Sequence, residues 1–175
     1  VTGGPLDQGR LVSTPWPLFG RADAKLYELT ASEAPSAVDT QVAQGAVLVG
    51  RQALEFARIE AGTPWFGVDF NEDNLPQEVG RDRQAISFNK GCYLGQEAVF
   101  MLEKRGHVKK RLVQLAVAAP VAAGDVVRAA DGSEVGQVTS YAPREQGGIA
   151  LGFVKYKHAR AGVELQVGST TARVE

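Results

Sequence analysis

The chain has 175 residues, of which 44% are apolar and 22% charged, so it can bury the core of one or two globular domains. A formal net charge of −1 excludes the global positive field expected of proteins that bind nucleic acid or an anionic membrane. One cysteine and two histidines exclude an internal disulfide and a typical zinc site, and they favour a reducing, cytoplasmic setting.

Residues 1–24 are rich in glycine and proline and have no hydrophobic periodicity. We expect a linker or the remnant of a larger domain there. This segment lacks a basic stretch followed by an apolar one, so we expect no signal peptide. The longest uncharged apolar run, residues 115–123, is too short for a bilayer and contains Pro120, so we also expect no membrane span.

Residues 25–31, KLYELTA, alternate as in a strand. Ser32 is the expected N-cap of a short helix that has Pro35 in its first turn and Val38 and Val42 on one face. Residues 46–50, AVLVG, then predict a short apolar strand or turn. These segments begin the mixed α/β part of the chain.

A second helix is expected over residues 51–62. Leu54, Ala57 and Ala61 fall on one stripe, and Gly62 is the expected C-cap. Residues 66–85 follow as a long acidic loop with at most one strand.

A third helix is predicted from Leu94 to Arg105. Leu94, Ala98, Met101 and Leu102 can share one face of it, and Gly106 is the expected cap.

From residue 109 onward the pattern changes to six short β-rich segments at roughly ten-residue spacing. Asp131-Gly132 lies between the second and the third, and this dipeptide predicts a tight hairpin turn. Such strands predict a small antiparallel barrel. We therefore expect an α+β protein with an α/β domain at 25–108 and a six-stranded β-barrel at 109–175.

Residues 89–97, NKGCYLGQE, contain the one cysteine. A thiol is a useful nucleophile only as the thiolate, and nearby Lys90 and the start of the following helix would favour that form. Gly91 and Gly95 leave the backbone bare, so a ligand can approach. A lone cysteine is also commonly a small buried hydrophobe. The residues alone leave Cys92 open between a poised thiol and a packing residue.

Other charged residues carry weaker signals. Glu97, in the first helical turn, suits either a charge–dipole contact or a carboxylate that accepts N–H groups from a heterocyclic ligand. Arg58 and Glu60 are two residues apart on a helix, so they cannot both face inward. The basic run at residues 104–111 has no aromatic residue and is expected to be a solvated surface, with phosphate or carboxylate binding as the alternative.

The acidic loop resembles the start of a calcium loop because Asp69, Asn71 and Asp73 alternate. Asn74 and Gly80 occupy the two positions at which such loops need glycine and glutamate. We therefore exclude calcium and expect no metal.

The octet K-G-C-Y-x-G-Q-E at residues 90–97 resembles the signature of the YgfZ family. These are folate-binding proteins related to the T-protein, the aminomethyltransferase of the glycine cleavage system. Residues 53–78 resemble the stretch before this signature, and GHVKKRLVQL resembles the crossover into the C-terminal barrel. ADGSEVGQVTSYAP and GIALGFVKYKHARAGVEL resemble barrel strands that both groups share. The resemblance runs from about residue 25 to the end.

The resemblance implies three domains around a channel that holds a tetrahydrofolate, and a role in assembling or repairing iron–sulfur clusters. It implies that Cys92 is the functional thiol. The arginine of an L-R-x-E-A-G segment in T-proteins matches Arg58. The expected cofactor-binding residues are Arg58, Lys90, Gly91, Tyr93, Gln96 and Glu97. The implied partners are folate and iron–sulfur proteins.

The chain also departs from this family. The family's N-terminal domain is missing, so we expect a fragment, a truncated reading frame or one chain of a two-chain assembly. T-proteins lack the cysteine-centred signature, which argues against true aminomethyl transfer but leaves a folate-dependent aminomethyltransferase as the alternative. A third possibility is a non-catalytic module that docks to the missing domain, and an exposed apolar patch on residues 25–60 would indicate it.

Overall fold

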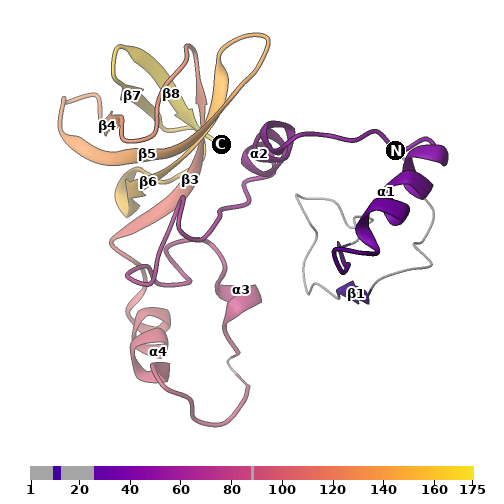
Figure 1. The fold of residues 1–175 in the computed structure, drawn as a ribbon. Helices are drawn as coiled ribbons and strands as arrows, with labels where there is room; N and C mark the ends of the chain where they lie inside the picture. Colours follow the sequence, from indigo (N-terminus) through magenta and orange to yellow (C-terminus); the bar gives the residue numbers. More distant parts are fainter. Residues whose placement is uncertain (1–9, 13–25, 88) are drawn as a thin grey trace. The chain divides into compact units, whose positions relative to one another are not determined.

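The computed structural model describes residues 10–12, 26–87 and 89–175. The chain divides into two compact units, Val1–Glu55 and Phe56–Glu175 (Figure 1). None of the helices in the described ranges is long and apolar enough to cross a membrane. Most of the segment expected to be a linker, residues 1–24, lies outside the described residues.

The first unit contains a two-stranded antiparallel ribbon. Strand β1, Arg10–Val12, pairs with β2, Leu26–Glu28, with Leu11 opposite Tyr27. The strand expected within residues 25–31 is therefore confirmed. The strand at Arg10–Val12 was not predicted, because strand pairing across an intervening segment leaves no local periodic signal.

Helix α1, Ala34–Ala43, has Pro35 in its first turn as expected, but Ser32 does not cap it. The Glu33 backbone N–H donates to Thr30 Oγ1 at 3.3 Å, and the Thr30 N–H donates to Glu33 Oε2 at 2.9 Å. This reciprocal pair is a capping box of the T-x-x-E type. The cap therefore begins two residues before the predicted one.

Residues 46–50 form neither a strand nor a turn, which corrects the prediction for AVLVG. Val47, Leu48 and Val49 are 65–71% exposed. Val38 and Val42 of α1 are also exposed, and an apolar hollow of about 310 Å³ is lined by these five valine and leucine side chains together with Leu29. The first unit thus carries an exposed apolar patch.

Helix α2, Arg51–Glu60, buries Arg58 and Ile59 rather than the predicted stripe. Ala57 is exposed and Ala61 lies beyond the helix. The helix ends at Glu60, and Gly62, the expected C-cap residue, has a φ of 62°. Thr63 N–H donates to Arg58 O and Gly62 N–H to Ile59 O, the two hydrogen bonds of a Schellman cap.

Residues 61–95 are mostly irregular. Phe66 and Phe70 form an isolated bridge in the acidic loop, and a four-residue helix α3, Asp82–Ala85, was not predicted. Helix α4, Gln96–Arg105, starts two residues later than predicted and ends at Gly106, with a φ of 104°. Its predicted apolar face is wrong in part, because Leu94 and Met101 are exposed, whereas Val99 is buried.

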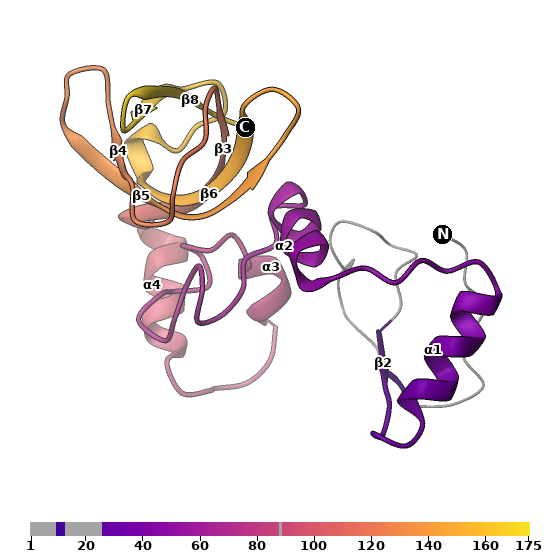
Figure 2. The same cartoon turned by 45° about the horizontal axis from the view of Figure 1, so that its top comes forward.

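The six predicted strands are all present and close into an antiparallel barrel (Figure 2). Their order around the barrel is β3-β6-β5-β4-β7-β8, and β8 pairs with β3 to close it. The strands are β3 Lys110–Val117, β4 Val126–Arg128, β5 Glu134–Pro143, β6 Gly148–Lys155, β7 Glu164–Val167 and β8 Thr170–Val174, and a short 3-10 helix η1, Tyr156–His158, follows β6. The turn at Asp131-Gly132 is confirmed by a Gly132 N–H bond to Ala129 O of 2.9 Å. The fold class expected from the sequence is confirmed.

Two apolar clusters stabilise the second unit. One fills the barrel, and its fully buried members include Leu115, Val127 and Val154. The other lies outside the barrel wall, where Ile59 of α2 packs against Ile149 and Leu151 of β6. Strand β6 is therefore buried on both faces, which explains its nearly continuous apolar sequence, GIALGFVK.

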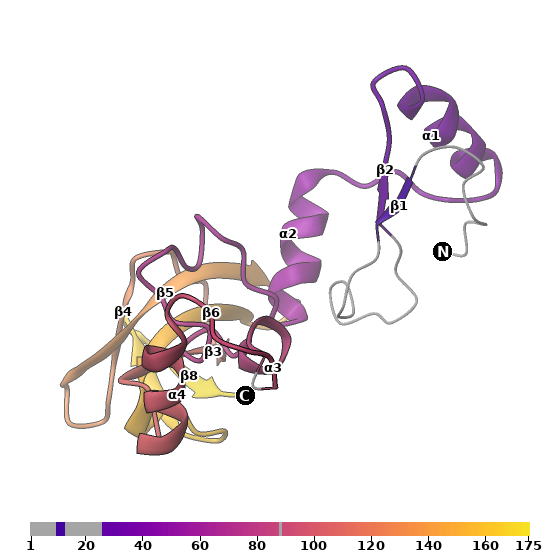
Figure 3. The same ribbon diagram turned by 90° about the horizontal axis from the view of Figure 1, so that it is seen from below.

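Helices α3 and α4 lie on one side of the barrel (Figure 3). The loop that leads into α4 lies at the end of this helix that points away from the barrel (Figures 1 and 2). This loop contains the cysteine segment. The fold thus presents the two parts of the predicted site, Arg58 and residues 90–97, on different elements.

Candidate functional site

Arg58 is the most buried charged residue in the described chain, at 1% exposure. Its Nη1 lies 2.6 Å from Asp69 Oδ2, and its Nη2 donates to Ser140 Oγ at 2.9 Å. Its guanidinium lies 4.8 Å from the centre of the Trp65 ring. Of the pair Arg58 and Glu60, Arg58 is thus the residue that faces inward, as their spacing on one helix requires.

Asp69 is the centre of this buried network. Its Oδ2 also accepts the Trp65 backbone N–H at 2.9 Å, and its Oδ1 accepts the hydroxyls of Thr139 and Ser140, both at 2.6 Å. A buried carboxylate is tolerated when it is paired with a cation and its oxygens accept further hydrogen bonds. Asp69, which the sequence pattern suggested only as a rejected calcium ligand, therefore ties the acidic loop to α2 and the barrel.

A bulge in β5 makes this arrangement possible. Val138 pairs with Gly152 and Ser140 with Leu151, so Thr139 is an extra residue in the strand. Successive side chains of a regular strand point to opposite faces, whereas a bulge re-aims one of them. Both neighbouring hydroxyls can therefore reach the same oxygen of Asp69. Local sequence patterns do not predict this network, since Arg58 is 11 residues from Asp69 and 82 from Ser140.

The C-terminal end of α2 is also held by the barrel. Gln114 Nε2 of β3 donates to the carbonyl oxygens of Ile59 at 3.0 Å and Glu60 at 3.1 Å. These carbonyls belong to the last turn of the helix, where partners within the helix are missing. Gln114 and Asp69 together fix the position of Arg58.

The segment at residues 89–95 forms an open loop before α4. Cys92 is a free, exposed thiol, and Lys90 and Glu97 are exposed as well. A Cβ atom built on Gly91 or on Gly95 meets no atom within 4 Å, and Gly95, with a φ of 85°, is the N-cap of α4. The structure therefore places Cys92 at the surface and not in a packed core.

Tyr93 links the other motif residues. The Lys90 Nζ atom lies 4.9 Å from the centre of the Tyr93 ring, and the Tyr93 backbone N–H donates to Gln96 Oε1 at 3.3 Å. The Tyr93 hydroxyl is buried and has no hydrogen-bond partner among the described residues. A buried phenol usually has a partner, so this hydroxyl is a candidate contact for a bound molecule.

The basic run contacts aromatic rings that come from elsewhere in the chain. Lys110 Nζ lies 4.5 Å from the Phe153 ring centre, and the His107 ring stacks on Tyr156 at 4.5 Å. These are intramolecular packing contacts, and the choice between a solvated surface and phosphate or carboxylate binding stays a prediction. His158, the other histidine, is half-buried.

The residues predicted to bind folate differ in how accessible they are to a ligand. The motif loop has an open backbone at Gly91, an exposed thiol and charges on Lys90 and Glu97, all accessible to a ligand. The guanidinium of Arg58, in contrast, is enclosed by Asp69, Ser140 and Trp65. A contact between Arg58 and folate remains a prediction. Within the described ranges, no group of three or more His, Cys, Asp or Glu side chains is placed to hold a metal ion.

The chain resembles proteins of known family. Residues 110–175 match the glycine cleavage T-protein C-terminal barrel domain. Over 127 residues, or 71% of this chain and 34% of the relative, it is 35% identical to an aminomethyltransferase of Synechocystis. Over 58 residues, or 33% of this chain and 18% of the relative, it is 43% identical to the tRNA-modifying protein YgfZ of Blochmanniella pennsylvanica.

A solved structure extends the likeness beyond the barrel. The glycine cleavage system aminomethyltransferase T from Bartonella henselae superposes with a TM-score of 0.72 at 25% identity. The superposition covers 83% of this chain and 43% of that protein. The chain spans about a third of the length of the aminomethyltransferase of Synechocystis, so the likeness extends to part of such proteins.

Proposed function

Because residues 110–175 form a T-protein C-terminal barrel domain, we propose that this chain works as part of a tetrahydrofolate-binding protein in which Cys92 is the reactive group. The observation that carries this proposal is the exposed Cys92 thiol in an open loop at the start of α4. An exposed cysteine can be reached by a ligand, and its thiolate is a nucleophile. We place its work in the cytoplasm, because a chain with a single cysteine cannot form an internal disulfide and suits a reducing compartment.

The finer proposal is a YgfZ-like role in supporting iron–sulfur proteins. It is supported by the complete octet at residues 90–97 and by the 43% identity to a YgfZ protein. In this role Cys92 would supply the thiol. Lys90 and Glu97 would make polar contacts with the ligand. The buried Tyr93 hydroxyl, which has no partner among the described residues, would form a hydrogen bond with it. Gly91 and Gln96 would shape the loop, and Arg58, which pairs with Asp69, would hold an anionic or polar part of the folate.

A titration of the 175-residue chain with tetrahydrofolate, followed by calorimetry, tests the core of this proposal. We expect saturable binding and a several-fold loss of affinity in a Tyr93→Phe variant, which removes only the unpartnered hydroxyl. Tyr156→Phe, which alters a ring packed on His107, is the matched control. The absence of saturable binding would overturn the proposal for this chain.

The reactivity of Cys92 is tested separately by its rate of alkylation with iodoacetamide at pH 7. We expect a faster rate than that of an unstructured peptide with the sequence of residues 89–97. Lys90→Gln should slow alkylation because it removes the nearest cation in the sequence. Equal alkylation rates for the protein and the peptide would show that Cys92 is an ordinary surface thiol.

The second candidate is folate-dependent aminomethyl transfer, which the likeness to the two aminomethyltransferases favours. An assay with a methylamine-loaded carrier protein and tetrahydrofolate separates the candidates. Transfer that is unaffected by Cys92→Ser would support the second candidate. Tetrahydrofolate binding without transfer would support the first.

A further inference from the structure

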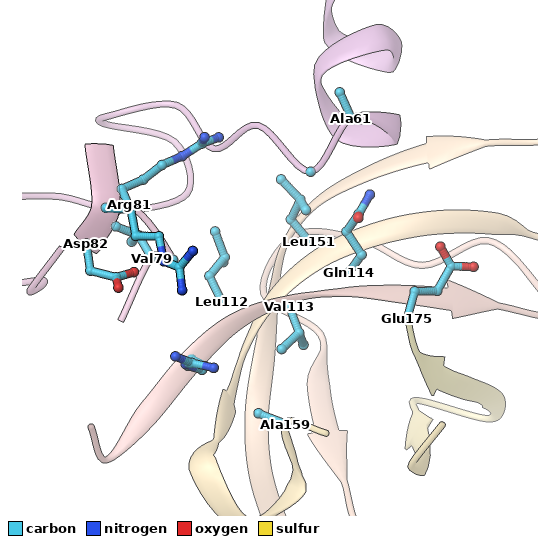
Figure 4. Close-up of a pocket in the computed structure, with 14 residues that line it drawn as sticks. Ala61, Val79, Arg81, Asp82, Leu112, Val113, Gln114, Leu151, Ala159 and Glu175 are labelled. Atoms are coloured by element: carbon cyan, nitrogen blue, oxygen red, sulfur yellow. The ribbon is translucent and has the colours of Figure 1, made fainter. Parts of the chain in front are cut away.

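A cavity of about 590 Å³ lies between the end of α2, the start of α3 and the outer face of β3, within the second unit (Figure 4). Ala61 enters from the α2 side, Arg81 and Asp82 from α3 and the residue before it, and Leu112 from β3. Arg83 and Arg111 also line it. We call this cavity the arginine pocket.

The ion pairs among the described residues involve three arginines, none of which lines this pocket. Arg58, Arg128 and Arg144 each pair with a carboxylate, at 2.6, 2.7 and 3.4 Å. Within the described part of the chain, the guanidiniums of Arg81, Arg83 and Arg111 make no ion pair. The Arg111 guanidinium lies 5.9 Å from the centre of the Tyr156 ring, so the pocket holds three cations of which none is paired with a carboxylate of the described residues.

Arg81 carries the main physical argument. It is only partly accessible to solvent, and this burial lowers the pKa of its guanidinium from the ordinary value. A partly buried cation without a counter-ion loses hydration and gains no attraction in return. A bound anion would supply that missing attraction, and arginine suits carboxylate and phosphate because its planar fork donates two parallel hydrogen bonds.

The other residues that line the pocket limit the kind of ligand that it can bind. Val79 and Leu151 are buried apolar side chains on the wall, and Leu112 is half-buried, so the pocket can also accept an apolar body. Its volume lies within the range of about 300–1,000 Å³ typical of small-molecule sites. The carboxylates of Asp82 and Glu175 line the pocket beside the three guanidiniums, so the pocket suits a single anionic group rather than a polyanion.

A smaller hollow of about 180 Å³ adjoins the pocket, since Asp82 and Arg111 line both. Gln77 also lines it, is 8% exposed and donates through Nε2 to Val99 O at 3.2 Å. Its buried Oε1 has no hydrogen-bond partner among the described residues. A ligand that fills both hollows can offer this oxygen a donor.

We propose that the arginine pocket binds a small organic anion, a molecule with one carboxylate or phosphate group on an apolar body. Arg81 and Arg83 hold the anionic group, Arg111 adds its charge, and Val79, Leu112 and Leu151 contact the apolar part. This site is separate from the loop that carries Cys92.

Calorimetric titration of the full chain with phenyl phosphate and with benzoate tests this proposal, with benzyl alcohol as the uncharged probe and constant ionic strength throughout. We expect one saturable site for at least one anion, no saturable binding of benzyl alcohol, and a loss of about tenfold or more in affinity in R81Q/R83Q. The preferred anion identifies the group as phosphate or carboxylate. The matched control R160Q/R173Q removes the same charge from exposed residues outside the pocket and should bind as the unmodified chain does.

Absence of saturable binding of both anions, or equal weakening by the two double variants, would overturn the proposal. The single variant R83Q alters an exposed side chain, so it keeps the test decisive if R81Q/R83Q does not fold. Cys92→Ser should leave anion binding unchanged. A failure of tetrahydrofolate binding therefore remains distinguishable from a failure of this site.

Discussion

At the scale of single residues, Asp69 has the largest expected effect on stability. Asp69→Asn leaves the buried Arg58 guanidinium without its counter-ion, and breaking a buried pair in this way costs about 3–5 kcal/mol of unfolding free energy. Urea denaturation measures the loss. Asp73→Asn, at an exposed position of the same loop, is the control and should change stability little. A loss below about 1 kcal/mol would mean that Arg58 finds another partner.

The sequence predicted individual residues least well where their partners are distant. The resemblance alone assigns Arg58 to a folate pocket, and its burial against Asp69 and Ser140 depends on a bulge 82 residues away. The exposure of Cys92 could not be decided from spacing, since a cysteine flanked by glycines suits a packed turn as well as an open loop. Side-chain roles of this kind follow from tertiary contacts.

At the scale of elements, the capping box of α1 makes a prediction about pH. The pKa of the Glu33 carboxyl is lowered, first by the hydrogen bond from the Thr30 hydroxyl and then by that from the Thr30 backbone. A carboxyl whose pKa is lower in the folded state stabilises the fold at pH values above its unfolded-state pKa of about 4.3. This stabilisation is lost as the pH falls through the lower, folded-state pKa. The N-terminus of α1 should therefore fray in that acidic range.

Titration of the Glu33 carboxyl by NMR measures this effect. We expect its pKa to rise toward the ordinary value in Thr30→Ala, which removes the hydroxyl donor. Thr40→Ala is the control, because the Thr40 hydroxyl donates to Ser36 O and does not contact Glu33. A Glu33 pKa that is the same in all three proteins would contradict the capping box.

Strands were predicted better than helical faces for a physical reason. Barrel strands such as β5 and β7 alternate buried and exposed side chains and end at tight turns, so each local pattern carries its own evidence. The stripe predicted for α2 consisted of one leucine and two alanines, which bury little area, and Ile59 and the stem of Arg58 took its place. The four-residue α3 has too few residues to show a helical period.

At the scale of the whole molecule, the exposed residues 46–50 mark the place where the described residues within 26–175 should be cut first. Thermolysin cleaves before aliphatic side chains, and Val47, Leu48 and Val49 lie in irregular, exposed backbone. Limited proteolysis followed by mass spectrometry should yield a resistant fragment that begins within residues 47–49 and keeps the barrel intact. First cuts within residues 110–175 would contradict the expectation that the closed barrel resists cleavage better than residues 46–50 do.

The exposed apolar patch on the first unit bears on the third possibility for the chain, a module that docks to a partner. Val38, Val42 and residues 47–49 form the patch that this possibility required within residues 25–60. The aminomethyltransferase of Synechocystis is about three times as long as the segment that matches this chain, so it contains further parts of the fold. The general architecture was thus accessible from the sequence, whereas the occupant of this patch was not.

The closure of the barrel by β8 on β3 has a consequence for aggregation. Every barrel strand has a neighbour on both sides, so the backbone N–H and C=O groups of the ring are withheld from other chains. Detachment of β8, the last strand, would turn β3 and β7 into free edges, and β3 carries the apolar sequence RLVQLAV. A chain shortened before Thr170 should therefore pair edge to edge with its own copies, and the last few residues protect the whole domain from self-association.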